Sequence, residues 1–470
     1  MPTSSPHTRL VSLAWLVVLT ALGMAAASTA GAMPLTGLQD DRIYRSNIDP
    51  DPRTRLMANL GAEVIRVDLR WDLVARARPT SPRDPGDDAY DWERYDPIVA
   101  AARRHRISVL FTVWGTPGWA ADPAVESSDR FPDWAKRPAD AEDYGDFARA
   151  AAARYAPRGV RLWEAWNEPN LPLFLRPQFA LRDGVWRADS PRVYAALMRE
   201  FYGAVKEVDP TARVAGGVTA PVGNRCPLSC PRSADGRVAP IDFIRGIARR
   251  GLRPPMDAVA HHPYPATAPR SSTSPGVAYV DLYNLGRLVR VIDRTYLRGR
   301  PLWLTEFGFG TERVPEYPFH VSRGQQAAFL ADAVRRVGRM PRVRLFSWYL
   351  LQDNPGWTSG LLTEGARRKP AFASFALPLA AVERRTARGR TVARLSGQVR
   401  PAVGRTRVAL QQRGRGGWRT LRRLRTDRHG VFATTVPVGG AARYRVRWAG
   451  TARTGDRVSR ASRGVTVGGR

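Results

Sequence analysis

The sequence predicts an α/β chain in which a (β/α)8 TIM barrel is followed by a small C-terminal antiparallel β-sandwich. Between about residues 33 and 382, short apolar runs alternate with longer amphipathic segments. Most of these runs are apolar at consecutive positions, which is typical of parallel strands buried on both faces. From residue 383 to 470, short runs instead alternate apolar residues with arginine, which indicates half-exposed antiparallel strands.

Eight apolar runs are the expected strands of the barrel. They lie at residues 34–39, 62–69, 107–114, 160–166, 212–218, 256–262, 301–307 and 343–351. Helical segments are expected between them at 139–156, 190–208, 282–296 and 321–338. Ser190 with Pro191, and Ser322, are the expected starts of two helices. The alternative is an open doubly wound sheet, but no glycine-rich phosphate loop follows the first strand.

The C-terminal strands are short and are separated by Gly, Asp and Pro. They are expected at residues 392–401, 406–414, 418–427, 430–438 and 444–450. The stretch "TDRHGVF" marks one turn between them. The change of composition at "RRTARGRT", residues 384–391, predicts the linker between the two domains.

The formal net charge is +32, and most of it lies in the C-terminal domain. After Glu383, 23 arginines against two aspartates give +21 in 87 residues. This charge has two interpretations: a solvated surface with an arginine bias, or docking on an anionic cell-envelope polymer such as a cell-wall or capsular polysaccharide. Nucleic acid is disfavoured as a partner because the chain carries no nucleic-acid motif and export is expected.

Residues 1–32 predict a secretory signal peptide. The apolar stretch "LVSLAWLVVLTALGM" follows a weakly basic start, and "STAGA" offers small residues for cleavage. An uncleaved membrane anchor is the alternative, but the stretch is shorter than the roughly 20 residues of a spanning helix. We expect a secreted or extracellular protein, free or bound to the cell envelope, with no membrane contact after cleavage.

The chain contains two cysteines, Cys226 and Cys230. Export permits a disulfide between them, which would close a very short loop and contribute about 2 kcal/mol. A metal site would need two further ligands nearby, and the spacing supplies none. We therefore predict a disulfide here and no metal.

Two glutamates stand where predicted strands end. Glu168 follows the run at 160–166 inside "WNEPN", and Glu306 lies near the end of the run at 301–307 inside "LTEFG". A TIM barrel builds its active site at the carboxyl ends of its strands. Pro169 disfavours a helical backbone at the preceding residue, so we expect Glu168 to be extended. Two carboxylates that face one cleft suggest glycoside hydrolysis, with one as acid/base and the other as nucleophile.

The pair "WNEPN" and "LTEFG" resembles the clan A glycoside hydrolases, whose acid/base ends the fourth barrel strand and whose nucleophile ends the seventh. The strand count puts Glu168 and Glu306 at those strands. "WGTPGWA" and "WEAWNEPNL" are most similar to family thirty-nine and related bacterial, cellulase-like members. The resemblance covers about residues 33–380. It implies a retaining enzyme with Glu168 as acid/base and Glu306 as nucleophile, and no metal or organic cofactor.

The resemblance also implies residues that bind substrate. Arg66 on the second strand looks like the arginine beneath the nucleophile, with a structural ion pair as its alternative. His262 and Tyr264 follow the sixth strand, where the clan carries an aromatic hydroxyl facing the nucleophile; packing of a loop is the alternative for Tyr264. Of the adjacent His261 and His262, only one can face the barrel interior, and we favour His262. Asn167 directly precedes the acid/base and is expected to contact the 2-hydroxyl of the sugar.

Two tryptophans complete the expected substrate site. Trp348 on the eighth strand looks like the tryptophan that floors the sugar subsite, with core packing as its alternative. Trp114 ends the third strand, where some clan members have a histidine, and is expected either to contact sugar or to pack. Glu164 is interpreted as a buried structural acid and is left out of the site.

The function expected from these residues is that of a secreted retaining glycoside hydrolase acting on β-linked oligo- or polysaccharides. Two modes of action stay open: endo-acting hydrolysis of the cellulase or mannanase type, and exo-acting hydrolysis of the xylosidase type. Loops at 171–189, 219–240 and 265–280 are long enough to close a pocket or to line a cleft. A non-catalytic carbohydrate-binding protein that keeps the fold is the alternative from another class.

Overall fold

The computed structural model describes residues 33–224, 233–269, 278–314, 319–401, 404–450 and 460–468. Residues 33–470 form one compact unit. Two predictions, the signal peptide at 1–32 and the disulfide between Cys226 and Cys230, lie outside the described residues. Among the residues that are described, none of the helices is both long and apolar enough to cross a bilayer.

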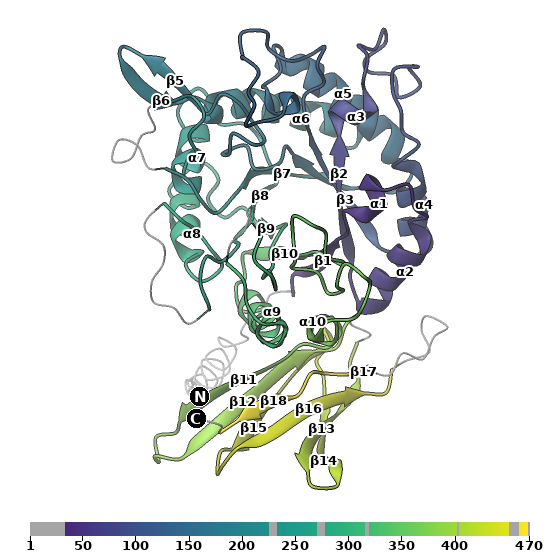
Figure 1. Ribbon diagram of the computed structural model, residues 1–470, viewed down its shortest axis with the longest axis vertical. Helices are drawn as coiled ribbons and strands as arrows, with labels where there is room; N and C mark the ends of the chain where they lie inside the picture. Colours follow the sequence, from purple (N-terminus) through teal and green to yellow (C-terminus); the bar gives the residue numbers. More distant parts are fainter. Residues whose placement is uncertain are drawn as a thin grey trace, which may run out of the picture. The chain divides into compact units, whose positions relative to one another are not determined.

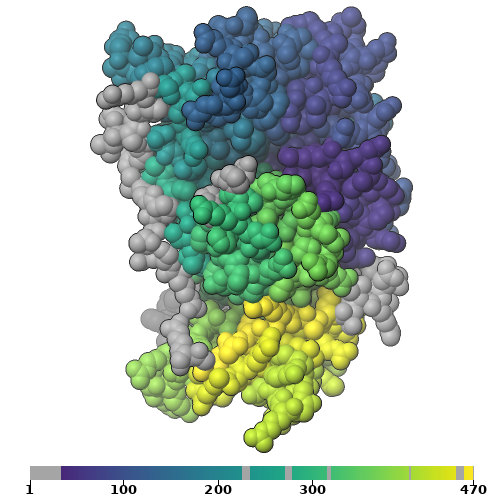
Figure 2. All heavy atoms as spheres, viewed as in Figure 1, coloured from purple at the N-terminus to yellow at the C-terminus, as the bar shows by residue number. Residues whose placement is uncertain are grey.

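Eight parallel strands close into the predicted barrel (Figure 1). The last strand, β10, pairs with the first, β1, and in Figure 2 the purple N-terminal residues lie against the green part of the barrel, in agreement with this closure. Each strand overlaps one of the eight predicted runs. In ring order they are β1 Leu35–Gln39, β2 Val64–Arg70, β3 Ser108–Trp114, β4 Leu162–Ala165, β7 Arg213–Thr219, β8 Ala258–His261, β9 Leu302–Leu304 and β10 Val343–Tyr349.

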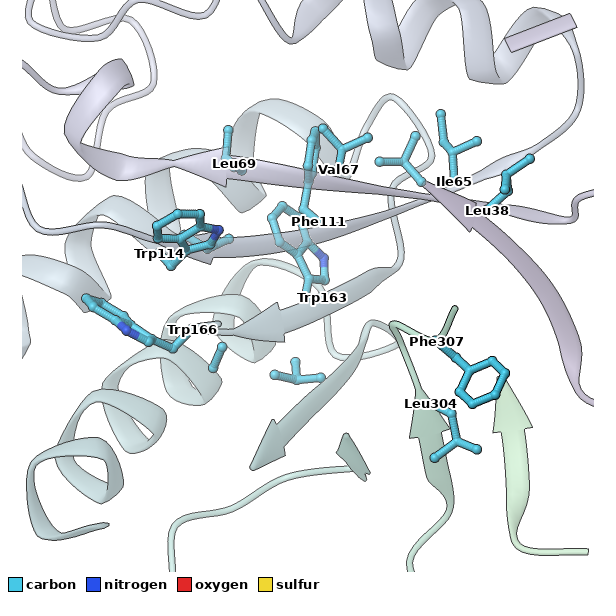
Figure 3. Close-up of a cluster of buried hydrophobic side chains, with 14 of the residues drawn as sticks. Leu38, Ile65, Val67, Leu69, Phe111, Trp114, Trp163, Trp166, Leu304 and Phe307 are labelled. Atoms are coloured by element: carbon cyan, nitrogen blue, oxygen red, sulfur yellow. The ribbon is translucent and has the colours of Figure 1, made fainter. Parts of the chain in front are cut away.

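The barrel strands separate two apolar layers. Ile65 belongs to the large cluster between strands and helices, whereas Val64 belongs to a small cluster with Leu345 and residues of four other strands. Because successive side chains of a strand point to opposite faces, the small cluster fills the barrel interior. Figure 3 shows part of the large cluster, in which Phe111 of β3 and Trp163 of β4 have ring centroids 5.7 Å apart. Polar residues of the same inward parity are available to build a site inside the barrel.

Helices cover the outside of the barrel strands (Figure 1). The predicted helices at 139–156, 190–208 and 321–338 are confirmed, but the one expected at 282–296 is shorter, because Asp281 and Asn284 form a hydrogen-bonded turn ahead of it. The bounds of the helices are α1 Arg42–Arg45, α2 Asp51–Leu60, α3 Trp71–Val74, α4 Asp96–Arg104, the 3-10 helix η1 Asp133–Ala135, α5 Ala141–Tyr155, α6 Ser190–Val208, α7 Pro240–Ile247, α8 Gly286–Ile292, α9 Arg323–Val337 and α10 Pro370–Ala376.

The two predicted helix starts differ in their caps. At α9 the Ser322 hydroxyl accepts from the Gln325 backbone N–H at 3.2 Å, and the Gln325 side chain accepts from the Ser322 N–H at 2.9 Å, which forms a capping box. At α6 the helix begins at Ser190, as expected, but the Ser190 hydroxyl donates to Gln178 Oε1 instead of capping. The position of the second start was therefore predictable, but its hydrogen bond was not.

The long loop at 171–189 contains a hairpin that the sequence analysis missed. Strands β5 Phe179–Arg182 and β6 Val185–Ala188 pair through a turn at Asp183 and Gly184, whose φ values are 52° and 72°. Asp-Gly between two short runs is a strong hairpin signal, because both turn residues need positive φ. The strands are only four residues long and partly exposed, so their apolar pattern is weak.

The C-terminal residues form two antiparallel sheets, as predicted. One sheet has the order β11-β12-β15, and the other has β14-β13-β16 with β17 and β18 on β16. Their facing side chains form a separate core that includes Leu395, Leu410, Phe432 and Val446. The bounds are β11 Leu379–Arg385, β12 Thr391–Gln398, β13 Arg407–Gly414, β14 Gly417–Arg425, β15 Val431–Pro437, β16 Ala442–Trp448, β17 Arg460–Ala461 and β18 Val465–Val467.

The predicted linker at 384–391 is wrong. This segment is the turn of the hairpin between β11 and β12, in which Arg385 pairs with Thr391 and Gly389 has φ of 72°. Four arginines in eight residues suggested a linker, although a hairpin exposed to solvent tolerates the same composition. The first strand of the sandwich therefore begins at Leu379, inside the range assigned to the barrel.

Candidate active site

Glu168 and Glu306 meet at the carboxyl ends of two barrel strands. Glu168 lies three residues beyond β4 and Glu306 two residues beyond β9, which are the fourth and seventh strands of the ring. One carboxylate oxygen of each lies within 4.8 Å of one of the other. The two side chains are 13% and 12% exposed, so each keeps a small opening to solvent. The fold thus brings together two acids that are far apart in the sequence.

Both glutamates line a cavity of about 590 Å³. This volume lies within the usual range of sites for small ligands. The wall of the cavity also contains the predicted residues Trp114, Asn167 and Tyr264. Parts of all three loops that were expected to border a site contribute to it, at 171–174, 220–222 and Tyr279.

The backbone between β4 and Glu168 is strained. Trp166 and Glu168 have φ of 67° and 40°, in the left-handed region, which costs a non-glycine residue on the order of 1–3 kcal/mol. The expectation of an extended Glu168 is therefore wrong. Pro169 disfavours the right-handed helical region for its predecessor, and the chain turns left-handed instead, with the Leu171 N–H donating to the Glu168 carbonyl at 2.9 Å. Such strain is common at functional sites.

Arg66 of β2 connects the polar residues inside the barrel. Its buried guanidinium donates to five side-chain oxygens: Glu306 Oε1 (2.6 Å), Gln39 Oε1 (2.7 Å), Asn167 Oδ1 (2.8 Å), Glu164 Oε2 (3.1 Å) and Asp68 Oδ1 (3.3 Å). Burial opposes the charge of Arg66, but the carboxylates around it, Glu306 first, raise its pKa well above the usual value. The sequence left two roles for Arg66 as alternatives: contact with the nucleophile Glu306 and a structural ion pair. The structure shows that Arg66 has both.

The carboxylate of Glu306 is held from two sides. Arg66 binds Oε1, and the Tyr264 hydroxyl donates to Oε2 at 2.8 Å. Burial, followed by the charge of Glu306, raises the pKa of Tyr264 well above its usual value, so this hydroxyl keeps its proton and donates it in the hydrogen bond. The two donors fix the orientation of the carboxylate toward the cavity.

His262 lies between the two glutamates. Its Nδ1 is 2.8 Å from Glu168 Oε1 and 3.8 Å from Glu306 Oε2. Burial disfavours a charged ring, but the carboxylates of Glu306 and Glu168 outweigh it and raise the pKa of His262 above 6.5. The adjacent His261 instead contacts Thr219 and the Val280 carbonyl, and burial lowers its pKa to about 3. The structure thus places His262, and not His261, against the acids.

The prediction that Trp348 floors the site is wrong. Trp348 is 1% exposed in the large apolar cluster, beside Phe307, and its Nε1 donates to the Ser359 carbonyl at 2.9 Å. Its neighbour Tyr349 lines the cavity instead. The run at 343–351 is apolar on both faces, so the sequence does not reveal which parity points inside the barrel.

Trp114 lines the cavity, but most of its surface is packed. It is 3% exposed, the guanidinium of Arg70 lies 4.3 Å from its ring centroid, and Trp134 and Phe174 meet the ring edge-on. The packing alternative therefore describes most of its contacts, and a small part of the ring remains for a ligand.

Sequence reasoning missed several residues of the cavity. Tyr349 and Trp357 have ring centroids 5.5 Å apart, and Trp357 also meets Tyr264 at 5.1 Å. Arg130 and Arg237 reach the wall from loops. Loop residues have no periodicity by which to recognise them, and the one signal for Tyr349 is its position as the last residue of the eighth strand.

The cluster of Glu168, His262 and Glu306 is also a conceivable metal site, because its donor atoms lie within 4.8 Å of one another. Two ligands of one tetrahedral zinc ion, each about 2.0–2.2 Å from the metal, lie about 3.3 Å or more apart. The Nδ1–Oε1 distance of 2.8 Å is instead that of a hydrogen bond. Arg66 and Tyr264 each donate a hydrogen bond to one oxygen of Glu306. These contacts fit a hydrogen-bonded acid pair better than a set of metal ligands.

Comparisons with known proteins give structural but no sequence-level matches. No family model matches the chain, and no curated protein matches it. Among solved structures, a family 39 glycoside hydrolase from Bacteroides cellulosilyticus WH2 has a TM-score of 0.56 at 20% identity, covering 86% of this chain and 79% of that one. A monomeric beta-xylosidase from Caulobacter crescentus CB15 has a TM-score of 0.53 at 18% identity, covering 87% and 95%.

A third similar structure is the GH39 enzyme from Xanthomonas axonopodis pv. citri, with a TM-score of 0.51 at 17% identity, covering 87% of this chain and 93% of that one. Each match covers more than four fifths of this chain. At such low identity they bear on architecture alone. The architecture implied by the two glutamate motifs is thereby confirmed, and this chain shares the fold of the family 39 glycoside hydrolases of known structure.

Proposed function

We propose that this protein is a secreted, retaining O-glycoside hydrolase that cleaves β-linked sugars by double displacement. The observation that carries the proposal is the approach of the Glu168 and Glu306 carboxylates to within 4.8 Å across one cavity. Retaining enzymes hold their two carboxyl groups about 5–5.5 Å apart, whereas inverting enzymes need about 6.5–9.5 Å to admit a water molecule. The likeness in fold to solved glycoside hydrolases supports the same conclusion.

In the first step, Glu306 attacks the anomeric carbon while Glu168, as the acid, gives its proton to the departing glycosidic oxygen. The bond to the leaving sugar breaks as the Glu306–sugar ester forms. Arg66 and Tyr264 orient Glu306 for this attack. His262 Nδ1 is hydrogen-bonded to Glu168 Oε1, so the imidazole positions the acid. The negative charge of Glu168 in turn favours the protonated form of His262.

In the second step, the Glu168 carboxylate takes a proton from water, which attacks the anomeric carbon and releases Glu306. The inversion in each step cancels, so the product keeps its configuration. Asn167 is assigned to the sugar 2-hydroxyl. Its Oδ1 is bound to Arg66, which leaves its amide N–H groups for the ligand. Trp114, Tyr349 and Trp357 supply apolar wall against which sugar faces can pack.

The size of the cavity favours action on short oligosaccharides or chain ends. About 590 Å³ is the volume of a pocket for a small ligand, and the loops at 171–174 and 220–222 form part of its wall. We therefore propose exo-acting hydrolysis of the xylosidase type. Endo-acting hydrolysis of a polysaccharide is the other mode, and the size of the products distinguishes the two.

We also propose that the protein is exported and that its basic C-terminal domain meets an anionic polymer of the cell envelope. Export rests on the signal-like residues 1–32, and the contact rests on the excess of arginine after Glu383. Export is tested by N-terminal sequencing of protein from the culture medium, where a mature terminus near residue 31 or 33 is expected.

The hydrolase proposal is tested with a panel of aryl β-glycosides and polysaccharides, using wild type, Glu168→Gln and Glu306→Gln. Wild type should turn over at least one substrate, and both variants should lose activity on the order of 10⁴-fold. Glu306→Ala with azide should recover part of the turnover and give the glycosyl azide of inverted configuration. NMR of the first-formed wild-type product should show the retained anomer. Full activity in Glu306→Ala, or an inverted sugar from wild type, would refute the assignment.

A further inference from the structure

One face of the five-stranded sheet in the C-terminal domain carries arginines that point away from the core. In β16 the alternate residues Tyr444, Val446 and Trp448 belong to the core of the sandwich. Because neighbouring side chains of a strand point to opposite faces, the arginines between and before them lie on the outer face. They are Arg443, Arg445 and Arg447.

The neighbouring strands extend this face. Arg423 of β14 and Arg447 of β16 are both register partners of Ala409, so they lie in one row across the sheet. In the next row the Arg445 Nε donates to Gln411 Oε1 at 2.8 Å, and the Gln411 amide donates to the Thr420 hydroxyl at 3.2 Å. Beyond them Arg413 pairs with Trp418. We call the set of Arg413, Trp418, Arg423, Arg443, Arg445 and Arg447 the basic face.

Within the described residues, the charges of the basic face have no acidic partners. In the part of the chain that the structure describes, no residue after Lys369, which pairs with Asp353, forms a salt bridge. None of the arginines of the basic face therefore has one. The guanidinium of Arg445 lies 4.4 Å from the ring centroid of Trp418. Burial, and then the charges of Arg447 and Arg413, lower the pKa of Arg445. An anion bound here would relieve this repulsion between like charges.

We propose that the basic face is a second carbohydrate-binding site that takes an acidic polysaccharide, with its arginines on the sugar carboxylates. A guanidinium matches a carboxylate with two parallel hydrogen bonds. Arg445 and Arg447 are two residues apart on one strand, so their backbones are about 7 Å apart and their charges follow one another along the strand. Thr420 supplies a hydroxyl for sugar hydroxyls, and Trp418 supplies an aromatic edge.

Two other anionic partners fit less well. Single-stranded nucleic acid binds to exposed rings that stack successive bases, whereas the basic face has one ring, and Arg445 covers it. An anionic membrane surface is usually held by inserted apolar side chains as well as by charge, and the basic face has none besides Trp418. The inference deepens the proposed contact with an envelope polymer and rests on that part of the proposed function, not on hydrolysis.

The test measures binding of the full-length protein to polygalacturonate by titration calorimetry at low salt. The double variant Arg445→Gln/Arg447→Gln should bind about tenfold more weakly than wild type, and Trp418→Ala should also weaken binding. The matched control, Arg385→Gln/Arg388→Gln, removes the same charge from the exposed β11–β12 hairpin and should bind within about twofold of wild type. Circular dichroism and aryl-glycoside turnover report whether each variant folds.

Three results would overturn the inference. Equal losses in the double variant and its control would mean that net charge alone attracts the polymer. Binding of neutral dextran as tight as that of polygalacturonate would show that the arginines do not cause the binding. Tighter binding of single-stranded DNA or of anionic vesicles at the same salt would assign the basic face to that partner. Loss of hydrolysis in the substrate panel leaves this result unaffected, so the two proposals fail separately.

Discussion

At the residue scale, Arg66 determines how the candidate active site is held. It is fully buried, yet it contacts Glu306, Glu164 and Asn167 at hydrogen-bond distance. Removing one partner of a buried charge pair typically costs about 3–5 kcal/mol, because the other charge is left unpaired. Arg66 therefore links the stability of the barrel interior to the orientation of Glu306, and a substitution of Arg66 would change both stability and activity. Substitutions of its neighbours allow the two effects to be measured separately.

Tyr264→Phe should lower kcat by about 10²-fold with little loss of stability. The change removes only the hydroxyl that donates to Glu306 Oε2 at 2.8 Å, and losing one such donor to a reacting group commonly costs this much. Steady-state kinetics on an aryl glycoside and a thermal melt provide the two measurements. Tyr202→Phe is the control, since its hydroxyl binds Asp257 away from the cavity. Unchanged kcat in Tyr264→Phe would mean that Tyr264 only packs the loop.

His262 should make stability depend on pH in a defined direction. Its pKa in the folded protein is raised above 6.5, its usual value in the unfolded chain, so the folded state binds its proton more tightly. Its charge therefore contributes fully to stability below about pH 6.5, and this contribution disappears as pH rises through the folded pKa. Unfolding of wild type and His262→Gln across this range should give a difference in free energy that shrinks with rising pH. A difference that grows with pH would contradict the assignment.

At the element scale, strand parity positions the site, and local hydrogen bonds begin the helices. The segments after β4 and β9 bring Glu168 and Glu306 to the same end of the barrel, because the carboxyl ends of the strands coincide in a parallel ring. Arg66 of β2 reaches Glu306 from inside the barrel. Adjacent residues of a strand face opposite sides: Trp348 packs in the apolar core, whereas Tyr349 lines the cavity. An error of one residue in the predicted parity therefore selects the wrong side chain. The helices are held by their own local bonds, of which the capping box of α9 is the clearest.

Ser322→Ala should lower the free energy of unfolding by about 1 kcal/mol, since the capping hydroxyl is lost while the helix itself remains. Chemical denaturation monitored by circular dichroism measures the change. Ser81→Ala is the matched control, because Ser81 is exposed and, among the residues that the structure describes, only its backbone is hydrogen-bonded, with the N–H donating to Asp87. Its change should stay within about 0.5 kcal/mol. Equal effects in both variants would show that the cap adds nothing.

At the scale of the whole molecule, the buried Arg400 and the partly buried Arg460 connect the barrel to the sandwich. The Arg460 guanidinium donates to the carbonyls of Leu60 and Ala376 in the barrel, at 3.5 and 3.4 Å, and to that of Arg400. Arg400 in turn donates to the Phe375 carbonyl at 3.4 Å. Burial lowers the pKa of each arginine to about 10, which remains high enough to keep both charged at neutral pH. The junction is thus made largely of hydrogen bonds from side chains to backbone.

Arg460→Met should lower the free energy of unfolding by about 1–3 kcal/mol, because it leaves buried carbonyls without a donor while keeping an apolar chain of similar length. Scanning calorimetry should show a lower Tm, together with a broader or divided transition as the sandwich uncouples from the barrel. Arg384→Met, on the exposed part of β11, is the control and should change neither. A Tm equal to that of wild type would show that the junction does not depend on Arg460.

Much of this architecture could be read from local patterns. The eight apolar runs predicted every barrel strand, because parallel strands buried on both faces need continuous apolar sequence. The Asp183–Gly184 pair is also a sequence signal for a hairpin, but the strands on either side are too short and too exposed to show a clear apolar pattern. The length of the predicted helix at 282–296 was wrong because side-chain hydrogen bonds around Asp281 compete with helix formation.

The sequence by itself determined the order of the strands, the succession of a barrel and a sandwich, and the positions of Glu168 and Glu306 at the fourth and seventh strands. These follow from periodicity and spacing, which are properties of neighbouring residues. The tertiary structure alone decided that the two carboxylates approach within 4.8 Å, that Tyr349 and not Trp348 faces the cavity, and that Glu168 is left-handed. Those features depend on how the ring of strands closes and on which face of each strand turns inward, and a pattern that is apolar on both faces does not encode that choice.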